Sequence, residues 1–272
     1  MICFKYQAAG NDFILVTSPE SMAEISTDEV IRLCDRRYGI GADGLIILES
    51  SREHDFSMRF FNNDGSGGMM CGNGGRCIVD LARRSGIPAS GKDDSWLFEA
   101  PDGIHSGRIV ASEGNKSIVC LSMNDIASVD TVELPETEGQ DSRAWRMNTG
   151  TDHLVIFRDD LDKTDVLNEG RRWRYDSRFA PKGVNVNFVQ ISAPGKPLRV
   201  RTYEKGVEYE TLSCGTGIIA SAIAAWMKGD HRGKYTLRST SDTFSVSFSH
   251  LSGIFSNVEL TGPVELVFQA II

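Results

Sequence analysis

Two cysteines stand in the same short motif at widely separated positions of the chain. The motifs are Cys71-Gly-Asn-Gly74 and Cys214-Gly-Thr-Gly217, and a helix-forming segment follows each of them. A thiol directly before a helix meets free N–H groups and a partial positive charge, which favour the thiolate and can also hold a carboxylate. Glycine lacks a Cβ, so the backbone can approach a ligand closely. Each motif therefore pairs a reactive sulfur with an anion-binding turn.

Two equivalent thiols are suited to the inversion of a stereocentre without a cofactor. If Cys71 and Cys214 address opposite faces of one carbon, one thiolate can remove a proton while the other thiol delivers one. A carboxylate held by the helix N-termini would stabilise the charge that develops beside that carbon. The other four cysteines are predicted to be small buried apolar residues, and they are Cys3, Cys34, Cys77 and Cys120.

The residues around the two motifs repeat in the same order. Four segments of the first half match four of the second half at separations of 140 to 143 residues, and the matched pairs begin at Gly10 and Gly150, Gly41 and Gly183, Met58 and Val200, and Cys71 and Cys214. The repeat predicts an α+β fold of two pseudo-symmetric lobes from an internal duplication. Each lobe is expected to be a curved mixed or antiparallel sheet around a central helix, with the active site in the cleft between them. The expected lobes are residues 1–115 plus 262–272, and residues 116–261.

Local patterns predict the elements that position the motifs. Short β-branched or aromatic runs bounded by Gly, Asn or Asp predict strands at 4–6, 13–17, 45–49 and 56–61. Ser26 or Thr27 is expected to cap a helix. Further helices are predicted at 75–84 and 217–228, and the second is apolar almost all round, so it is expected to be buried. A last strand at 264–268 is expected to return to the first lobe.

Composition excludes several classes of protein. The chain has 272 residues, 29 Lys and Arg, 37 Asp and Glu, and a net charge of −8, so it lacks the basic character of a protein that coats nucleic acid. Its most apolar stretch, 218–227, is about half as long as a membrane span. We see no secretory signal, and six cysteines without one do not suggest a disulfide framework. We expect a soluble cytoplasmic protein with free thiols and no nucleic-acid or membrane partner.

Two other patterns are discounted. The segment Gly39-Ile-Gly-Ala-Asp-Gly44 has the spacing of a dinucleotide fingerprint, but it follows a predicted helix and opens a predicted strand, the reverse of that motif. Cys71 and Cys77 lack a second Cys or His pair at zinc-ligand spacing. We therefore predict neither a nucleotide site nor a metal site.

The chain resembles the diaminopimelate epimerase family in six segments that occur in family order. The most specific are Met58-Arg-Phe-Phe-Asn-Asn-Asp-Gly-Ser66 and Met70-Cys-Gly-Asn-Gly-Gly-Arg-Cys77, and the others begin at Gly10, Gly39, Gly183 and Tyr203. The resemblance implies an epimerase, independent of pyridoxal phosphate, that interconverts LL- and meso-diaminopimelate in lysine and cell-wall precursor synthesis. It also implies two lobes that close over a small amino-acid substrate, no cofactor, and a homodimer.

The same resemblance implies roles for individual residues. Cys71 and Cys214 would be the catalytic pair, and His153 and Glu204 would tune the sulfurs. The positions implied to contact substrate are Asn11, Asn62, Gly72, Asn73, Thr151, Asn185, Glu204, Lys205, Gly215 and Thr216. Of these, Gly72, Asn73, Gly215 and Thr216 would hold the reacting carboxylate and amine.

The chain departs from the family pattern mainly in the second lobe. Lys205 stands where Arg is usual, Thr151-Asp152 replaces Asn-Pro, and one extra residue lies near Glu208-Tyr209. In the first lobe, Gln7-Ala8 stands where His-Gly is usual. Arg can grip a carboxylate with two parallel hydrogen bonds, whereas Lys is a point charge. The pattern therefore supports the reaction class more strongly than the identity of the substrate.

Three alternatives stay open at this point. One is a racemase or epimerase of the same superfamily that acts on another amino acid, such as a proline derivative or histidine. Another is a thiol–disulfide protein in which Cys71 and Cys214 form a redox pair. The sequence contains no Cys-x-x-Cys motif, which counts against this alternative. The third is an amino-acid binder that has no catalytic activity.

Overall fold

Strands dominate the computed structural model, which describes residues 2–17, 25–68, 70–135, 142–193 and 195–271. The chain divides into two compact units, Met1–Ser122 with Thr261–Ile272, and Met123–Leu260. The first boundary lies at the end of strand β7 (Lys116–Met123), whereas the sequence analysis placed it at the start of that strand. The reason is that β7 pairs with β6 (Gly103–Glu113) inside the first unit.

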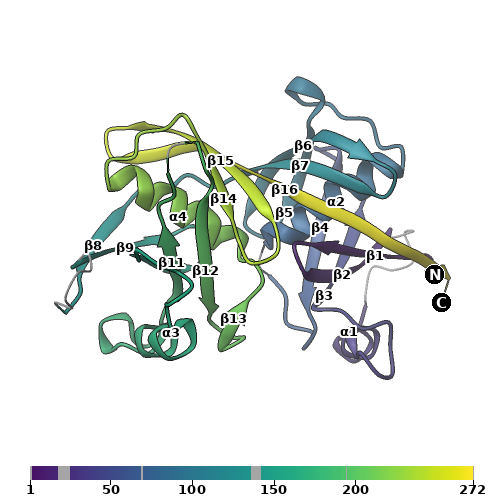
Figure 1. Cartoon of the computed structure of the whole chain (residues 1–272). Coiled ribbons are helices and arrows are strands. Elements are labelled where there is room, and N and C mark those ends of the chain that lie inside the picture. Colours follow the sequence, from purple (N-terminus) through teal and green to yellow (C-terminus); the bar gives the residue numbers. More distant parts are fainter. Residues whose placement is uncertain (1, 18–24, 69, 136–141, 194, 272) are drawn as a thin grey trace. The chain divides into compact units, whose positions relative to one another are not determined.

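The first unit is a mixed sheet that closes on itself (Figure 1). Its strand order is β1 (Ile2–Ala8), β2 (Asn11–Thr17), β3 (Gly44–Glu49), β4 (Phe56–Asn62), β5 (Trp96–Ala100), β6, β7 and then β16 (Ile254–Ile271). The last strand also pairs with β1, where Ile2 lies opposite Ile271. The final residues of the last strand therefore belong to the first unit.

The second unit repeats this strand arrangement. Its order is β8 (Val129–Glu133), β9 (Arg143–Asn148), β10 (Asp152–Phe157), β11 (Asn185–Gln190), β12 (Leu198–Glu204), β14 (Lys234–Arg238) and β15 (Thr243–Leu251), with the first part of β16 beside β15 and β13 (Tyr209–Thr211) beside β12. Helix α3 (Val166–Arg174) packs on one face through a cluster that includes Trp173 and Phe188. Helix α1 (Thr27–Cys34) covers the corresponding strands of the first unit.

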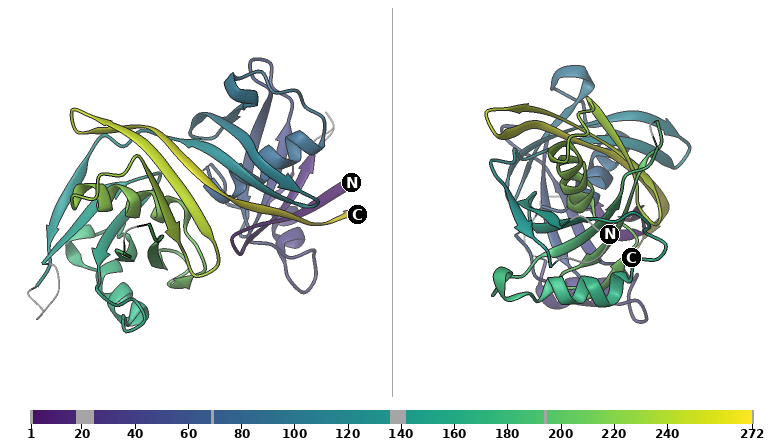
Figure 2. Two further views of the ribbon diagram at one scale, coloured as in Figure 1. Left: turned by 45° about the horizontal axis from the view of Figure 1, so that its top comes forward. Right: turned by 60° about the vertical axis from the view of Figure 1, so that its left-hand side comes forward.

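One buried helix runs through each unit, and both views of Figure 2 show the second of them among its strands. Helix α2 (Gly72–Arg84) packs on β1, β2, β3, β4 and β6, and helix α4 (Gly215–Met227) packs on β9 to β12, β14 and β15. Both begin directly after the motif cysteine, so the predicted starts at 75 and 217 were wrong. The glycines of the motifs adopt helical conformation and supply the first turn. The predicted α+β fold of duplicated units, each with a central helix, is confirmed.

The shorter elements complete the chain. Ser26 caps α1, because its Oγ accepts a hydrogen bond from the Glu29 N–H at 3.2 Å. Two single turns of 3₁₀ helix occupy Lys92–Asp94 and Ser177–Phe179. Among the described residues, no helix has both the length and the apolar character that a bilayer span requires.

The strand register defines which residues of the two units are equivalent. On β2 and β3, Phe13 lies opposite Gly44, and on β10 and β11, His153 lies opposite Asn185. The sequence repeat pairs Phe13 with His153, so the register makes Gly44 equivalent to Asn185. The sequence alignment instead paired Asp43 with Asn185. It was one residue out in this segment, because weak sequence similarity does not determine the offset between the two units, whereas the hydrogen bonding of the sheet does.

The same register makes Ile46 and Asn187 equivalent. Each lies one full pleat further along its strand than the residues just described, and each faces the first turn of the central helix. Ile46 lies between Leu15 and Phe60, and Asn187 lies between Val155 and Thr202. Both side chains are completely buried. At this position one unit has a hydrocarbon and the other has an amide.

Candidate active site

Cys71 is the N-cap residue of α2. Its backbone is extended (φ −107°, ψ 115°), and its carbonyl accepts the first helical hydrogen bond, from the Gly75 N–H at 2.7 Å. The N–H groups of Gly72, Asn73 and Gly74 then have no acceptor within the helix, because they belong to its first turn. The sulfur is half-buried at the positive end of a 13-residue helix. This is the environment that the motif predicted.

Two of the predicted substrate contacts gather around this sulfur. Cys71 Sγ lies 3.9 Å from Asn11 Oδ1, and Asn73 Nδ2 donates to the same oxygen at 3.3 Å. Asn11 Nδ2 in turn donates to Asp43 Oδ2 at 2.6 Å. This bond orients the Asn11 amide with its oxygen toward the cysteine, so the group can accept a hydrogen bond from a thiol.

A network of charges anchors Asn11 from behind. Arg36 donates to Asp12 at 2.6 Å and to Asp43 at 2.8 Å, and Lys5 donates to Asp12 at 2.6 Å. Burial alone would raise the pKa of Asp12, but the hydrogen bonds from Arg36 and Lys5 hold it well below its ordinary value. The Asp12 carboxylate therefore stays ionised at neutral pH and keeps the strand end in place.

Arg76 is a buried cation that the sequence analysis did not assign. Its side chain is fully buried under the first turn of α2, where it donates to Gly72 O at 3.2 Å and to Asn73 Oδ1 at 2.7 Å. The second bond directs the Asn73 amide nitrogen toward Asn11. The signal was present in the motif itself, because Arg76 follows Asn73 by three residues and so shares its helix face.

Asn62 is the last residue of β4, before a turn, and it lies outside the hydrogen-bonded group around Cys71. Its amide nitrogen donates to Ser66 Oγ at 3.0 Å, and its backbone N–H donates to Ser66 O at 2.7 Å. It ends β4 opposite Gly44 of β3. The structure thus places Asn62 at the same end of the sheet as Asn11, on the neighbouring strand pair.

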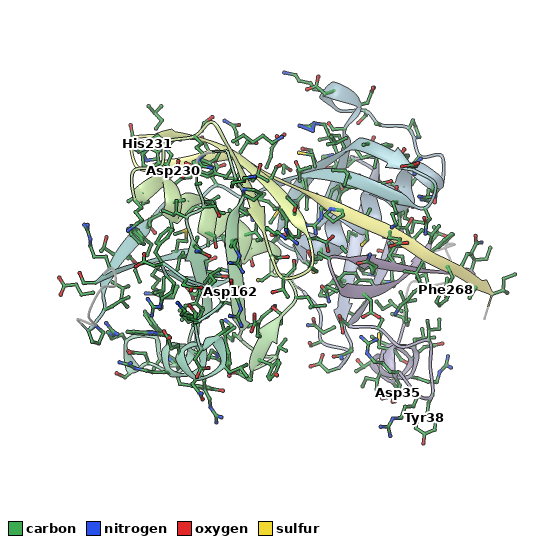
Figure 3. The ribbon with its side chains drawn as sticks, viewed as in Figure 1. Asp35, Tyr38, Asp162, Asp230, His231 and Phe268 are labelled. Atoms are coloured by element: carbon green, nitrogen blue, oxygen red, sulfur yellow. The ribbon has the colours of Figure 1, made fainter. Side chains whose placement is uncertain are left out.

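Cys214 is the N-cap residue of α4. Its backbone is again extended (φ −130°, ψ 108°), and its carbonyl accepts from the Ile218 N–H at 2.9 Å. The side chain is 7% exposed. Its sulfur lies 3.5 Å from Thr216 Oγ1, close enough for a hydrogen bond between hydroxyl and sulfur. Asp230 and His231, which are labelled in Figure 3, follow the other end of this helix.

His153 reaches this cysteine through the threonine. His153 Nε2 lies 2.9 Å from Thr216 Oγ1, and the imidazole is fully buried. Burial, with a smaller contribution from the charge of Lys205, lowers the pKa of His153 to about 3. The ring is therefore neutral at physiological pH. Neutral His153 is thus linked to Cys214 through Thr216 in a hydrogen-bonded row.

Three other predicted residues of the second unit lie where β11 begins and β12 ends: Asn185, Glu204 and Lys205. Asn185 Oδ1 accepts from the Lys205 N–H at 2.8 Å, and Asn185 is the register partner of His153. Glu204 Oε2 accepts from Thr211 Oγ1 at 2.8 Å. Thr151 closes the turn that enters β10, where its carbonyl accepts from the Thr149 N–H.

The extra residue near Glu208 fits within the turn between β12 and β13. Glu208 has a left-handed backbone (φ 57°), and its carboxylate accepts from the Gly206 N–H at 3.1 Å and from Arg174 Nε at 3.1 Å. Its own N–H donates to Glu204 O at 2.8 Å. The insertion is thus absorbed by a turn tied to α3, and the strand that carries Glu204 stays regular.

Close packing explains the last glycine of each motif. A β-carbon at Gly74 would lie 2.7 Å from Ile46 Cδ1, and one at Gly217 would overlap Asn187 Oδ1. Neither glycine has a positive φ. The glycines are therefore needed for contact between helix and strand, beyond the access to a ligand that the sequence suggested.

An open cavity of about 900 Å³ lies elsewhere on the second unit. Four of the charged side chains that line it form pairs within the unit: Arg199 with Asp162 at 2.5 Å and Arg201 with Glu210 at 2.7 Å. Asp162 is labelled in Figure 3. Within the described ranges, His, Cys, Asp and Glu side chains form no group of three or more that could hold a metal ion.

Known proteins resemble this chain in sequence and in fold. A family model described as diaminopimelate epimerase matches residues 3–121 and 146–267. The diaminopimelate epimerase of Flavobacterium psychrophilum is 40% identical over 274 residues, covering 100% of both chains. That of Chlorobaculum tepidum is 36% identical over 272 residues, covering 97% of this chain and 98% of the relative. Among solved structures, a Bacillus anthracis phenazine biosynthesis protein of the PhzF family has the same fold, with a TM-score of 0.72 and 15% identity over 100% of this chain and 99% of that one.

Proposed function

The chain belongs to the diaminopimelate epimerase family, and from that premise we propose that it interconverts LL- and meso-2,6-diaminopimelate by moving a proton between the two faces of an α-carbon. The family resemblance inferred from the motifs is confirmed, and with it the assignment to the isomerases. The observation that carries the proposal is that each unit holds one cysteine at the N-cap of its buried central helix.

The proposed reaction uses one thiolate and one thiol. The thiolate takes the α-proton and becomes a thiol, while the electron pair of the broken C–H bond stays on the α-carbon beside the carboxylate. The other thiol, on the opposite face, gives its proton to that carbon and becomes the thiolate. The configuration is inverted and no proton is gained or lost overall. In the reverse reaction Cys71 and Cys214 exchange roles.

The first turns of α2 and α4 are proposed to hold the reacting end of the substrate. Gly72 and Asn73 would contribute N–H groups from one helix, and Gly215 and Thr216 would contribute them from the other. Backbone N–H groups fixed at a helix N-terminus bind carboxylates and stabilise negative charge that grows during proton removal. Free first-turn N–H groups at both cysteines support this assignment.

The residues beyond the reacting centre are proposed to position the substrate. We assign Asn11, Asn62 and Asn185 to substrate contacts, Thr151 and Lys205 to the distal end, and Glu204 to contact with substrate and support of the sulfurs. His153 is assigned to the support of Cys214, in agreement with its link through Thr216. This mechanism needs no cofactor or metal.

Lys205 favours a second candidate, a racemase or epimerase of the same superfamily that acts on another amino acid. A lysine offers one point charge where an arginine would bind a distal carboxylate through two bonds. A smaller substrate that has no distal carboxylate would need no such grip. A substrate panel that includes proline derivatives and histidine, with products separated by chiral chromatography, distinguishes the two candidates.

We also propose, from the family, that the enzyme works in the cytoplasm as a homodimer and supplies lysine and cell-wall precursor synthesis. Size-exclusion chromatography with light scattering would measure the oligomeric state. A monomer at assay concentration that is fully active would contradict the dimer.

Proton NMR of LL-diaminopimelate with the reduced protein in D₂O tests the proposed function. The expected result is loss of the α-proton signal with formation of the meso isomer. Folded, reduced protein that exchanges no α-proton of diaminopimelate would overturn the substrate assignment. Exchange with another amino acid in the same assay would then establish the second candidate.

A further inference from the structure

A buried amide stands behind His153 on the side away from Cys214. Asn187 Nδ2 lies 3.0 Å from His153 Nδ1, and both side chains are fully buried. His153 Nε2, on the other side of the ring, faces Thr216 Oγ1. The three side chains and the cysteine therefore form one row, from Asn187 to Cys214 Sγ. The sequence analysis gave Asn187 no role.

Neighbouring groups fix which way the Asn187 amide points. Thr202 Oγ1 donates to Asn187 Oδ1 at 2.9 Å, and Asn187 Nδ2 donates to Leu154 O at 3.3 Å as well as facing the imidazole. If the amide were reversed, its oxygen would face the Leu154 carbonyl oxygen, and two acceptors would meet in a buried site. The nitrogen must therefore face His153.

We infer that Asn187 is a positioning residue that holds His153 in its Nε2–H tautomer and so directs the hydroxyl hydrogen of Thr216 toward the sulfur of Cys214. The inference rests on the proposed function, which makes Cys214 an acid and base. Because Asn187 Nδ2 is a donor, His153 Nδ1 must be the acceptor, and a neutral imidazole then carries its hydrogen on Nε2. That hydrogen donates to Thr216 Oγ1, which leaves the hydrogen of the threonine free for the sulfur. A hydroxyl that donates to the sulfur stabilises the thiolate relative to the thiol.

Two further observations agree with a fixed amide at this position. The first is the packing of Gly217, where any β-carbon would overlap Asn187 Oδ1, so helix α4 itself clamps the side chain. The second is the equivalent position of the first unit, where Ile46 fills the same space. Packing alone can thus be satisfied by a hydrocarbon, and the amide of the second unit has a different role. The lowered pKa of His153 fits the neutral ring that the row requires.

The tautomer can be measured without substrate. Protein labelled with ¹⁵N-histidine would be studied by long-range ¹H–¹⁵N correlation, with His153 assigned by loss of its signals in His153→Gln. We expect an unprotonated Nδ1 and a protonated Nε2 in the wild type at neutral pH. A protonated Nδ1 would overturn the inference. Because no substrate is present, this result does not depend on whether the proposed function is correct.

A set of variants connects the row to Cys214. Asn187→Leu keeps the size of the side chain and removes its donor, Thr216→Val removes the hydroxyl, and Thr216→Ser keeps it. The rate of Cys214 alkylation by iodoacetamide would be followed against pH in a Cys71→Ala background. We expect the apparent pKa of the thiol to rise in Asn187→Leu and Thr216→Val and to stay at the parental value in Thr216→Ser. Asn168→Leu, on the exposed face of α3, is the matched control for an Asn-to-Leu change.

Catalysis by the same variants separates a positioning role from a structural one. Loss of one hydrogen bond to a thiolate lowers kcat by about ten- to a hundredfold, and we expect this loss in Asn187→Leu with KM changed by less than about twofold. The double variant Asn187→Leu/Thr216→Val should be no slower than Thr216→Val alone, because both act through one bond. Additive losses, or an unchanged thiol pKa in folded Asn187→Leu, would overturn the inference. If the wild type has the expected tautomer but exchanges no α-proton, the proposed function is wrong, whereas the inferred hydrogen bonding from Asn187 to Cys214 is still supported.

Discussion

The two units share a frame but surround their cysteines with different chemistry. In the first, Phe13 and Ile46 occupy the buried positions beside the central helix, and Cys71 faces the amide of Asn11. In the second, His153 and Asn187 occupy the equivalent positions, and Cys214 faces the hydroxyl of Thr216. The duplication has thus kept the helix N-terminus and the thiol in both units, while the side chains behind them have diverged.

The difference indicates how the two thiols are held. Charged groups, Asp43 and Arg76, orient the amides around Cys71. A row of neutral groups supports Cys214, and the imidazole in it is kept uncharged by burial. The two thiols, which exchange acid and base roles in the proposed mechanism, are therefore surrounded by separate groups of residues, and each group can be altered alone.

The largest expected effect is the loss of either sulfur. Cys71→Ala and Cys214→Ala should each lower the rate of epimerisation by about a thousandfold or more, the scale of a general acid or base, because one face of the α-carbon loses its proton carrier. Chiral chromatography of diaminopimelate after incubation measures the rate. Equal activity in either variant and the wild type would remove that cysteine from the mechanism.

The next largest effect is expected when the buried His153 and Asn187 of the second unit are replaced by the residue types found at the equivalent positions of the first unit. In His153→Phe/Asn187→Ile the row behind Thr216 is replaced by hydrocarbon of the kind that already fits the other unit. We expect a folded protein whose kcat is lower by about ten- to a hundredfold, since the thiolate loses one charged hydrogen bond. Circular dichroism and steady-state kinetics provide the readouts. Unchanged kcat would show that the two units are equivalent in function.

Alanine at the last glycine of each motif compares the packing of the two units. Gly217→Ala meets an amide held by three hydrogen bonds, whereas Gly74→Ala meets the terminal methyl of Ile46. Overpacking costs about 1–3 kcal/mol, and we expect Gly217→Ala near the upper end and Gly74→Ala near the lower. Urea unfolding of the two variants beside the wild type measures both. A larger loss for Gly74→Ala would contradict the description of Asn187 as clamped.

The smallest effect, counted for each pH unit, is a dependence of stability on acid that arises in the second unit. The pKa of His153 is lowered to about 3 in the folded protein, against about 6.5 in an unfolded chain. Between these values the unfolded chain binds a proton that the folded chain does not, so stability falls as the pH falls through this range. Each pH unit costs up to about 1.4 kcal/mol relative to the His153→Phe/Asn187→Ile variant. Unfolding free energies of both proteins from pH 7 to pH 4 test this, and parallel curves would refute it.

The sequence could predict the repeated frame because its signals are local. Glycines around Cys71 and Cys214 mark the turns, apolar periodicity marks the helices, and the run at 264–268 predicts a strand. In the structure that strand pairs with β1. The helix starts were placed too late because glycine is a poor helix former, although it is tolerated in a first turn where tertiary packing demands it.

The rest of the site depends on contacts between strands. Asn187 alternates along β11 with apolar residues, and nothing local distinguishes it from a solvent-facing polar residue of an edge strand. Only the pairing with β10 and β12 shows that it is buried between His153 and Thr202. Arg76 was overlooked for a related reason, because an arginine on a helix is usually exposed and only the fold reveals that this one is enclosed.

The central claim is that each unit supplies one thiol for one face of the α-carbon. The most direct test is α-proton exchange in D₂O by Cys71→Ala and Cys214→Ala, each given the substrate in both configurations and followed by NMR. The account predicts that each variant exchanges the α-proton of one configuration only, without epimerisation, and that the two variants choose opposite configurations. Exchange of the same configuration by both variants would contradict it.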